Sequence, residues 1–161
     1  MKRTLACLIT FLSPYSFASD IISTRQLTHE FATELAQFAV KTCVDMGYQV
    51  TAVVVDRNAT PQVMIRSSLA PRFTIQIATE KANASIMAGI KSGELRNNRQ
   101  DIRNELNHID GLIMMQGAIP VTASGSLLGA IGVSGAPGGE KDELCAQKAL
   151  DKIAERLEFA D

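Results

Sequence analysis

The 161-residue chain contains two histidines, His29 and His108, and these are its only imidazole side chains. Imidazole is a common axial ligand of haem iron. His108 lies in the polar run Asn107–Asp110, where it could ligate iron or could be an ordinary loop residue. His29 falls in the first turn of a predicted helix, where a solvent-exposed side chain is the simpler interpretation. Nothing in their spacing indicates a Ser-His-Asp triad or a zinc site.

Lys81 and Asp56 are the candidate acid–base residues. Lys81 lies within an Ala-rich segment, and a lysine on such a face could pair with an acid such as Asp56. A partly desolvated lysine beside a carboxylate is suited to proton transfer, whereas a solvated lysine is the competing interpretation. Asp142 and Glu143 begin the last predicted helix, where negative side chains interact favourably with the helix dipole, and that role alone is a sufficient explanation for them.

The glycine-containing run Gly129–Gly135 is the most distinctive segment. Glycine within a strand permits another group to approach the backbone closely, so this run predicts either a wall against which a flat ligand binds or a surface on which a helix packs. Its spacing does not fit a dinucleotide-binding loop. The chain also lacks the CxxC, HExxH, Walker and GxSxG signatures.

Hydrophobic periodicity predicts the elements that must position these residues. A first helix is expected from the N-cap Thr28 to Met46, and Gly47 is a natural stop. The expected strands are 49–55, 62–66, 111–115, 119–123 and 127–134, and further helices are expected at 74–90, ending before Ser92-Gly93, and at 142–158. The polar stretch Glu94–Asn107 is more typical of a solvated helix or loop than of a basic binding patch. The order α-β-β-α-β-β-β-α, with strands in hairpin groups, predicts an α/β (α+β) fold with a central antiparallel sheet.

The two ends of the domain hold Cys43 and Cys145. If the first and last helices cover the same face of the sheet, the two thiols could meet and form a disulfide. Two small apolar core residues are the alternative, and the sequence does not decide between them.

Residues 1–18 have the features of a secretory signal peptide. Lys2 and Arg3 precede a short apolar stretch, and Ser16–Ala18 offers a cleavage site. Cleavage would leave a single domain, 19–161, with 14 basic and 17 acidic residues and a net charge of −3. This charge argues against nucleic acid as the main partner. We therefore expect a periplasmic or secreted protein with no membrane insertion after cleavage.

Several of these motifs resemble the GlcG/HbpS family, also known as haem-binding or haem-degrading and found as the C-terminal domain of PduO-type proteins. The resemblance runs from about Leu27 to Ile153. It is carried by Ala52–Asp56, Arg66, Lys81-Ala82, Gly117–Pro120, and Gly129–Gly135 followed by Asp142-Glu143. It implies a profilin-like or Roadblock-like fold, assembly as a homo-oligomer, and binding of a small-molecule ligand, for which haem is the first candidate.

The family motif carries over to nine residues: Asp56, Arg66, Lys81, Gly117, Gly129, Ser134, Gly135, Asp142 and Glu143. Three stretches depart from the pattern: the turn Asn58–Pro61, the pair Gly117-Ala118, and the insert Glu94–Asp110. They fall in loops that are expected to border a pocket.

The leading hypothesis is an exported haem-binding protein that captures haem or acts as an accessory in haem or redox sensing. Arg66 and Lys81 are the candidates for binding the propionates, and His108 for the iron. One alternative is an enzyme acting on haem or on a small acid through Asp56 and Lys81. Another is a ligand-free interaction module that dimerises through its sheet.

Overall fold

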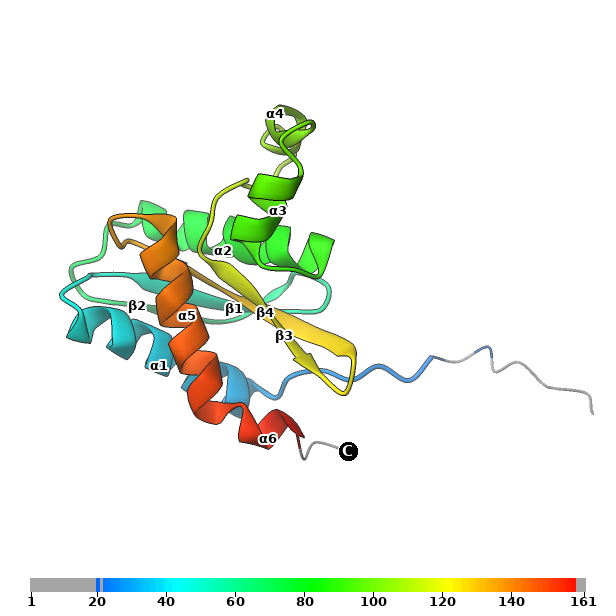
Figure 1. Cartoon of the computed structure of the whole chain (residues 1–161). Coiled ribbons are helices and arrows are strands. Elements are labelled where there is room, and N and C mark those ends of the chain that lie inside the picture. Colours follow the sequence, from blue (N-terminus) through cyan, green and yellow to red (C-terminus); the bar gives the residue numbers. More distant parts are fainter. Residues whose placement is uncertain (1–19, 21, 159–161) are drawn as a thin grey trace, which may run out of the picture.

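The computed structural model describes residue 20 and residues 22–158 (Figure 1). The predicted signal peptide, 1–18, lies outside the described residues. The elements are α1 (His29–Asp45), β1 (Thr51–Asp56), β2 (Pro61–Arg66), α2 (Phe73–Ala88), α3 (Ser92–Asn98), α4 (Arg103–Leu106), β3 (Ala118–Ala123), β4 (Ser126–Ser134), α5 (Gly139–Ile153) and α6 (Glu155–Glu158). None of the helices in this part of the chain has the length and apolar character that a membrane span requires.

The four strands form one antiparallel sheet in the order β2-β1-β4-β3, which confirms the predicted fold class. Because β1 lies between β2 and β4, Thr51 is aligned with Arg66 on one side and with Ser134 on the other. Side chains alternate between the two faces of a strand. Ala52 and Val54 accordingly enter one core, and Val53 and Val55 enter a second core on the opposite face.

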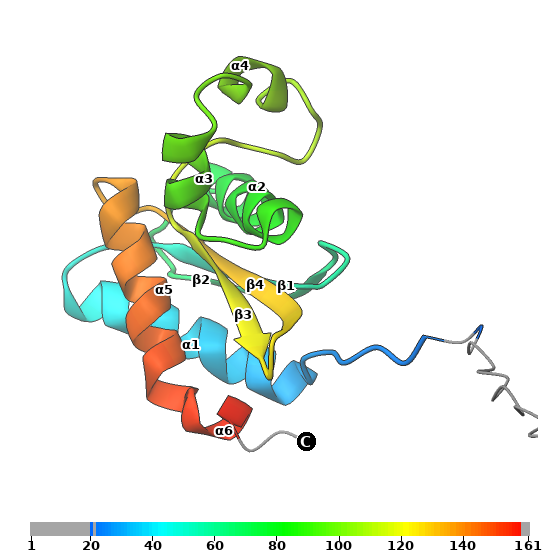
Figure 2. The same cartoon turned by 45° about the vertical axis from the view of Figure 1, so that its right-hand side comes forward.

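Helices cover both faces of the sheet. Figures 1 and 2 show α2 on one face and α1 with α5 on the other. The larger core lies under α1 and α5, and the smaller one lies under α2. Thr28 caps α1 as predicted, since its hydroxyl accepts a hydrogen bond from the Phe31 amide at 3.3 Å.

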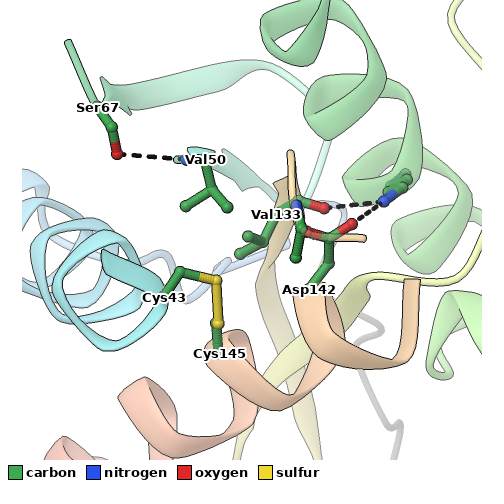
Figure 3. Close-up of a disulfide and its surroundings, with 8 residues drawn as sticks. Cys43, Val50, Ser67, Val133, Asp142 and Cys145 are labelled. Atoms are coloured by element: carbon green, nitrogen blue, oxygen red, sulfur yellow. Dashed lines mark hydrogen bonds and ion pairs between the residues drawn. A yellow bond between two sulfur atoms is a disulfide. The ribbon is translucent and has the colours of Figure 1, made fainter. Parts of the chain in front are cut away.

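Cys43 of α1 and Cys145 of α5 form a disulfide, with their Cα atoms 5.5 Å apart (Figure 3). Both residues are fully buried. The two helices thus share a sheet face, which was the condition for the cysteines to meet.

The prediction of a strand at 111–115 is wrong, because the segment is an irregular connection between α4 and β3. Gly111 has a φ of +85°, which is incompatible with an extended strand. Met114 instead packs with Ala84 of α2 and Leu95 of α3 in a small apolar cluster. Helix α2 also ends earlier than predicted, at the left-handed Gly89 (φ +67°), and Ser92 begins α3.

Candidate functional site

A cavity of about 550 Å³ lies between α2 and the segment 103–115. Helix α2 contributes Gln76 and Glu80. The opposing segment contributes four polar residues, five apolar residues and one glycine: Arg103, Asn107, His108 and Asp110, then Ile109, Leu112, Ile113, Met114 and Met115, and Gly111. Its size is typical of a small-molecule or cofactor site.

His108 is the cavity residue best suited to ligate a metal ion. Its Nδ1 lies 2.6 Å from the Asn104 carbonyl oxygen. A carbonyl oxygen can only accept, so Nδ1 carries the proton and donates it. In the neutral ring Nε2 therefore has the lone pair. A ring whose second nitrogen is hydrogen-bonded to a backbone carbonyl is the usual arrangement of a metal-ligating histidine.

Hydrogen bonds to two asparagines shape the loop that bears His108. The Asn107 side-chain oxygen accepts a hydrogen bond from the Met114 amide at 2.8 Å, which closes the loop on itself. Asn83 of α2 donates from Nδ2 to the Gly111 carbonyl at 2.9 Å, which ties the loop to the helix.

Lys81 forms a buried ion pair, but its partner is Asp142 and not Asp56 as predicted. The Lys81 amine lies 2.7 Å from Asp142 Oδ2 and donates a second hydrogen bond to the Val133 carbonyl at 3.0 Å. The exposed fractions of the Lys81 and Asp142 side chains are 1% and 4%. The competing interpretation, that Lys81 is solvated, is therefore also wrong. In Figure 3 the Asp142 carboxylate and the Val133 carbonyl converge on one amine nitrogen.

The carboxylate of Asp142 is held by Lys81 on one oxygen and by a backbone amide on the other. Its Oδ1 accepts a hydrogen bond from the Ala136 amide at 3.0 Å, in the loop ahead of α5. Burial raises the pKa of the Asp142 carboxyl above its ordinary value, and the charge and hydrogen bond of Lys81 oppose this shift. Asp142 therefore does more than interact with the helix dipole, because it joins α5 to α2 around the end of β4.

Asp56 and Arg66 have local partners of their own. Asp56 Oδ1 accepts hydrogen bonds from the amides of Asn58 and Thr60, at 2.8 and 2.9 Å, and so closes the turn between β1 and β2. The Arg66 guanidinium donates to the Ala70 carbonyl. The cavity lining includes neither Arg66 nor Lys81. The expectation that these two residues meet propionates is therefore not supported at this cavity.

The glycines of the motif allow close packing. A Cβ added at Gly132 would overlap the Ala78 carbonyl of α2, so the helix packs directly on the sheet at this position. A Cβ at Gly129 would overlap the Val55 carbonyl, and one at Gly135 would overlap the Gln49 carbonyl. For the run Gly129–Gly135, the structure therefore supports a packing surface and not a wall for a flat ligand.

Gly117 is required by the ion pair. A Cβ there would lie 2.6 Å from Lys81 Nζ and 2.9 Å from the Asp142 Cβ, and its φ is +133°. Ser134 is buried beside β1. Glu143 is half-buried, and its Oε2 has no hydrogen-bond partner among the described residues.

Of the predicted site residues, the structure therefore brings Lys81, Gly117 and Asp142 together, and it places His108 alone at the cavity. The sequence interpretation missed the cavity residues Gln76, Glu80, Arg103 and Asn107. Arg103 and Asn107 are within the polar insert, but only the fold shows that the insert turns back over α2.

The comparisons with known proteins agree with this fold. The family model of the haem-degrading protein HbpS-like family matches residues 27–151. No curated protein matches the chain in sequence. A crystal structure of HbpS is similar with 31% identity and a TM-score of 0.79, covering 86% of this chain and 97% of that one.

Two further solved structures are similar. The Klebsiella pneumoniae protein ORFY has 25% identity and a TM-score of 0.79, over 86% of this chain and 98% of that one. A complex of PduOC with haem has 24% identity and a TM-score of 0.73, over 80% and 95% of the two chains, and this likeness concerns the fold alone. Since the family model spans the sheet, α2, the cavity and most of α5, the chain belongs to the haem-degrading protein HbpS-like family.

Proposed function

We propose that this protein is an exported haem-binding protein that holds haem in the cavity between α2 and the segment 103–115. The observation that carries the proposal is the hydrogen bond from His108 Nδ1 to the Asn104 carbonyl, at 2.6 Å. It leaves Nε2 of a cavity-lining imidazole as an available iron ligand. The family of the chain, described as haem-degrading, supports the same ligand.

The cavity offers both apolar side chains and a cation to a porphyrin. Its volume of about 550 Å³ is within the usual range for cofactor sites. Leu112 and Ile113, which are half-buried, and Met115, which is exposed, supply apolar surface for the macrocycle. Arg103 makes no ion pair with any described residue, so its guanidinium is available to a propionate. Bound haem would supply an iron centre with redox chemistry, and His108 would supply a nitrogen ligand to the iron.

Export is supported by two features. Residues 1–18 have the pattern of a cleavable signal peptide. The Cys43–Cys145 disulfide is of the kind that persists in oxidising compartments and is rare in the cytosol. We propose a periplasmic or secreted location, which fractionation and N-terminal sequencing of the exported chain would test, with cleavage expected after Ala18.

A hemin titration of residues 19–161 tests the proposed function. We expect saturable binding with a sharp, shifted Soret band, and we expect His108→Ala to lose the band position of the wild type. His29→Ala is the matched control, since His29 is the other imidazole and does not line the cavity. Only broad, unsaturable hemin absorption of the wild type would exclude the proposal.

Degradation of haem is a second candidate, which the description of the family favours. The bound complex would then lose its Soret band in the presence of a reductant and oxygen. Lys81→Ala is not a suitable test of this activity, because it would leave the buried Asp142 carboxylate without its partner. His108→Ala, compared with His29→Ala, is the better pair.

The homo-oligomer implied by the resemblance stays a prediction, which sedimentation analysis would test.

A further inference from the structure

The segment that bears His108 has little structure of its own. Residues 107–115 pair with no strand, and their backbone hydrogen bonds are short-range, such as Leu112 to Ile109 at 3.1 Å and Met115 to Ile113 at 2.9 Å. Such bonds shape a loop but do not fix where it lies. A ligand-binding histidine must nevertheless be held close to its productive position.

A single hydrogen bond ties this loop to the sheet-packed helix α2. The Asn83 amide nitrogen donates to the Gly111 carbonyl at 2.9 Å. Among the described residues, no other hydrogen bond or ion pair joins segment 107–115 to α2. Met114 and Leu112 add apolar contacts in the cluster that contains Ala84 of α2.

The restraint at Gly111 extends to His108 through the loop itself. The Met114 amide donates to the Asn107 side-chain oxygen at 2.8 Å, and this bond closes residues 107–114 into a ring. Gly111 lies inside that ring, and His108 is next to Asn107. Gly111 adopts a φ of +85°, a left-handed conformation that turns the chain at the point of attachment. Moving the Gly111 carbonyl would therefore displace the whole ring.

We propose that Asn83 is a positioning residue of the haem site, which fixes loop 107–115 on α2 and thereby holds His108 for the iron. The inference rests on the proposed function, because it assigns Asn83 a task within that site. Asn83 itself does not line the cavity, so it acts through Gly111 and not on the ligand.

Gln62 provides a matched control. Like Asn83, it is half-buried and donates its side-chain amide to one backbone carbonyl, that of Leu27 at 3.3 Å. In both residues the amide oxygen is buried without a partner among the described residues. Gln62 belongs to β2 and does not line the cavity, so its substitution removes the same kind of hydrogen bond elsewhere in the molecule.

Two measurements on Asn83→Asp, Asn83→Ala, Gln62→Glu and Gln62→Ala test the proposal. The aspartate and glutamate variants are nearly isosteric and replace the donor by an acceptor. In haem-free protein, we expect hydrogen exchange of residues 107–115 to accelerate about fivefold in the Asn83 variants, the change expected from loss of one hydrogen bond. In the Gln62 variants we expect no change there. In the hemin titration, the Asn83 variants should shift the Soret band toward that of His108→Ala, and the Gln62 variants should retain the wild-type spectrum.

The outcomes separate this inference from the proposed function. Unchanged exchange at 107–115 in both Asn83 variants would overturn the role of Asn83, whatever the hemin result. Faster exchange with a wild-type hemin spectrum would overturn the link from Asn83 to His108. Failure of the wild type to bind hemin would instead exclude the proposed function, while the exchange data would still decide whether Asn83 holds the loop.

Discussion

Asp142 and Cys145 are three residues apart on α5, and each joins this helix to a different helix of the fold. Side chains with this spacing lie on the same side of a helix. Cys145 is bonded to Cys43 of α1 on one face of the sheet, and Asp142 pairs with Lys81 of α2, which covers the other face (Figure 3). One turn of α5 therefore connects the two layers that lie on either side of the sheet.

The first prediction concerns the disulfide. It closes a loop with a sequence separation of 102 residues, so it restricts the unfolded chain strongly. We expect the Cys43→Ala/Cys145→Ala variant to lose about 2–5 kcal/mol of unfolding free energy, measured in urea. Because both cysteines are fully buried, we expect the folded wild type to resist reduction by mild thiols. Equal urea midpoints for the wild type and the variant would contradict the prediction.

The second prediction concerns the buried ion pair. Lys81→Met leaves the Asp142 carboxylate buried without its cation, and we expect a loss of about 3–5 kcal/mol in unfolding free energy. Adding Asp142→Asn removes the unpaired charge and keeps an oxygen for the Ala136 amide, so the double variant should recover part of the loss. Urea unfolding measures both.

Lys41→Met is the control for this pair. Lys41 forms an exposed ion pair with Asp45 in α1, and its loss should change the unfolding free energy by at most about 0.5 kcal/mol. A double variant that is less stable than Lys81→Met alone would show that the charge of Asp142 is not the cause.

The third prediction concerns pH. Burial raises the pKa of Asp142 in the folded protein, so the folded state keeps this proton at pH values where the unfolded state has lost it. The contribution of Asp142 to stability should therefore fall as the pH rises from about 4, the ordinary carboxyl value, through the raised pKa. Urea unfolding of the wild type and of Asp142→Asn between pH 3.5 and 6.5 measures the difference. An increase in the relative stability of the wild type over this range would contradict the prediction.

The sequence predicted the elements better than their contacts. The first helix, the strands at 49–55 and 127–134 and the antiparallel sheet followed from periodicity, because burial of one face imposes a repeat on the sequence. The sequence marks both Lys81 and Asp142 as candidates, but it suggests Asp56 as the partner of Lys81. The true pairing depends on how α2 and α5 pass the end of β4, which no local pattern encodes.

The cavity was the least predictable feature. The polar stretch 94–107 contained Arg103 and Asn107, but its charges indicated only a solvated segment. An apolar run at 111–115 indicated a strand, whereas Met114 is buried against α2 and α3. The walls of the site are thus formed by a chain reversal set by Gly111 and by side-chain hydrogen bonds, and neither leaves a periodic signal in the sequence.

The last prediction concerns Arg103, the cavity residue expected to meet a propionate. Arg103→Gln should weaken hemin binding about fivefold, because a charge-assisted hydrogen bond is lost from the complex. The dimethyl ester of haem has no carboxylates, so its affinity should be the same for the wild type and the variant. Arg99→Gln is the matched control, since Arg99 comes from the same polar stretch, pairs with Asp101 at 3.0 Å and does not line the cavity. Equal losses for hemin and its dimethyl ester would show that Arg103 supports the shape of the cavity and does not bind the propionate.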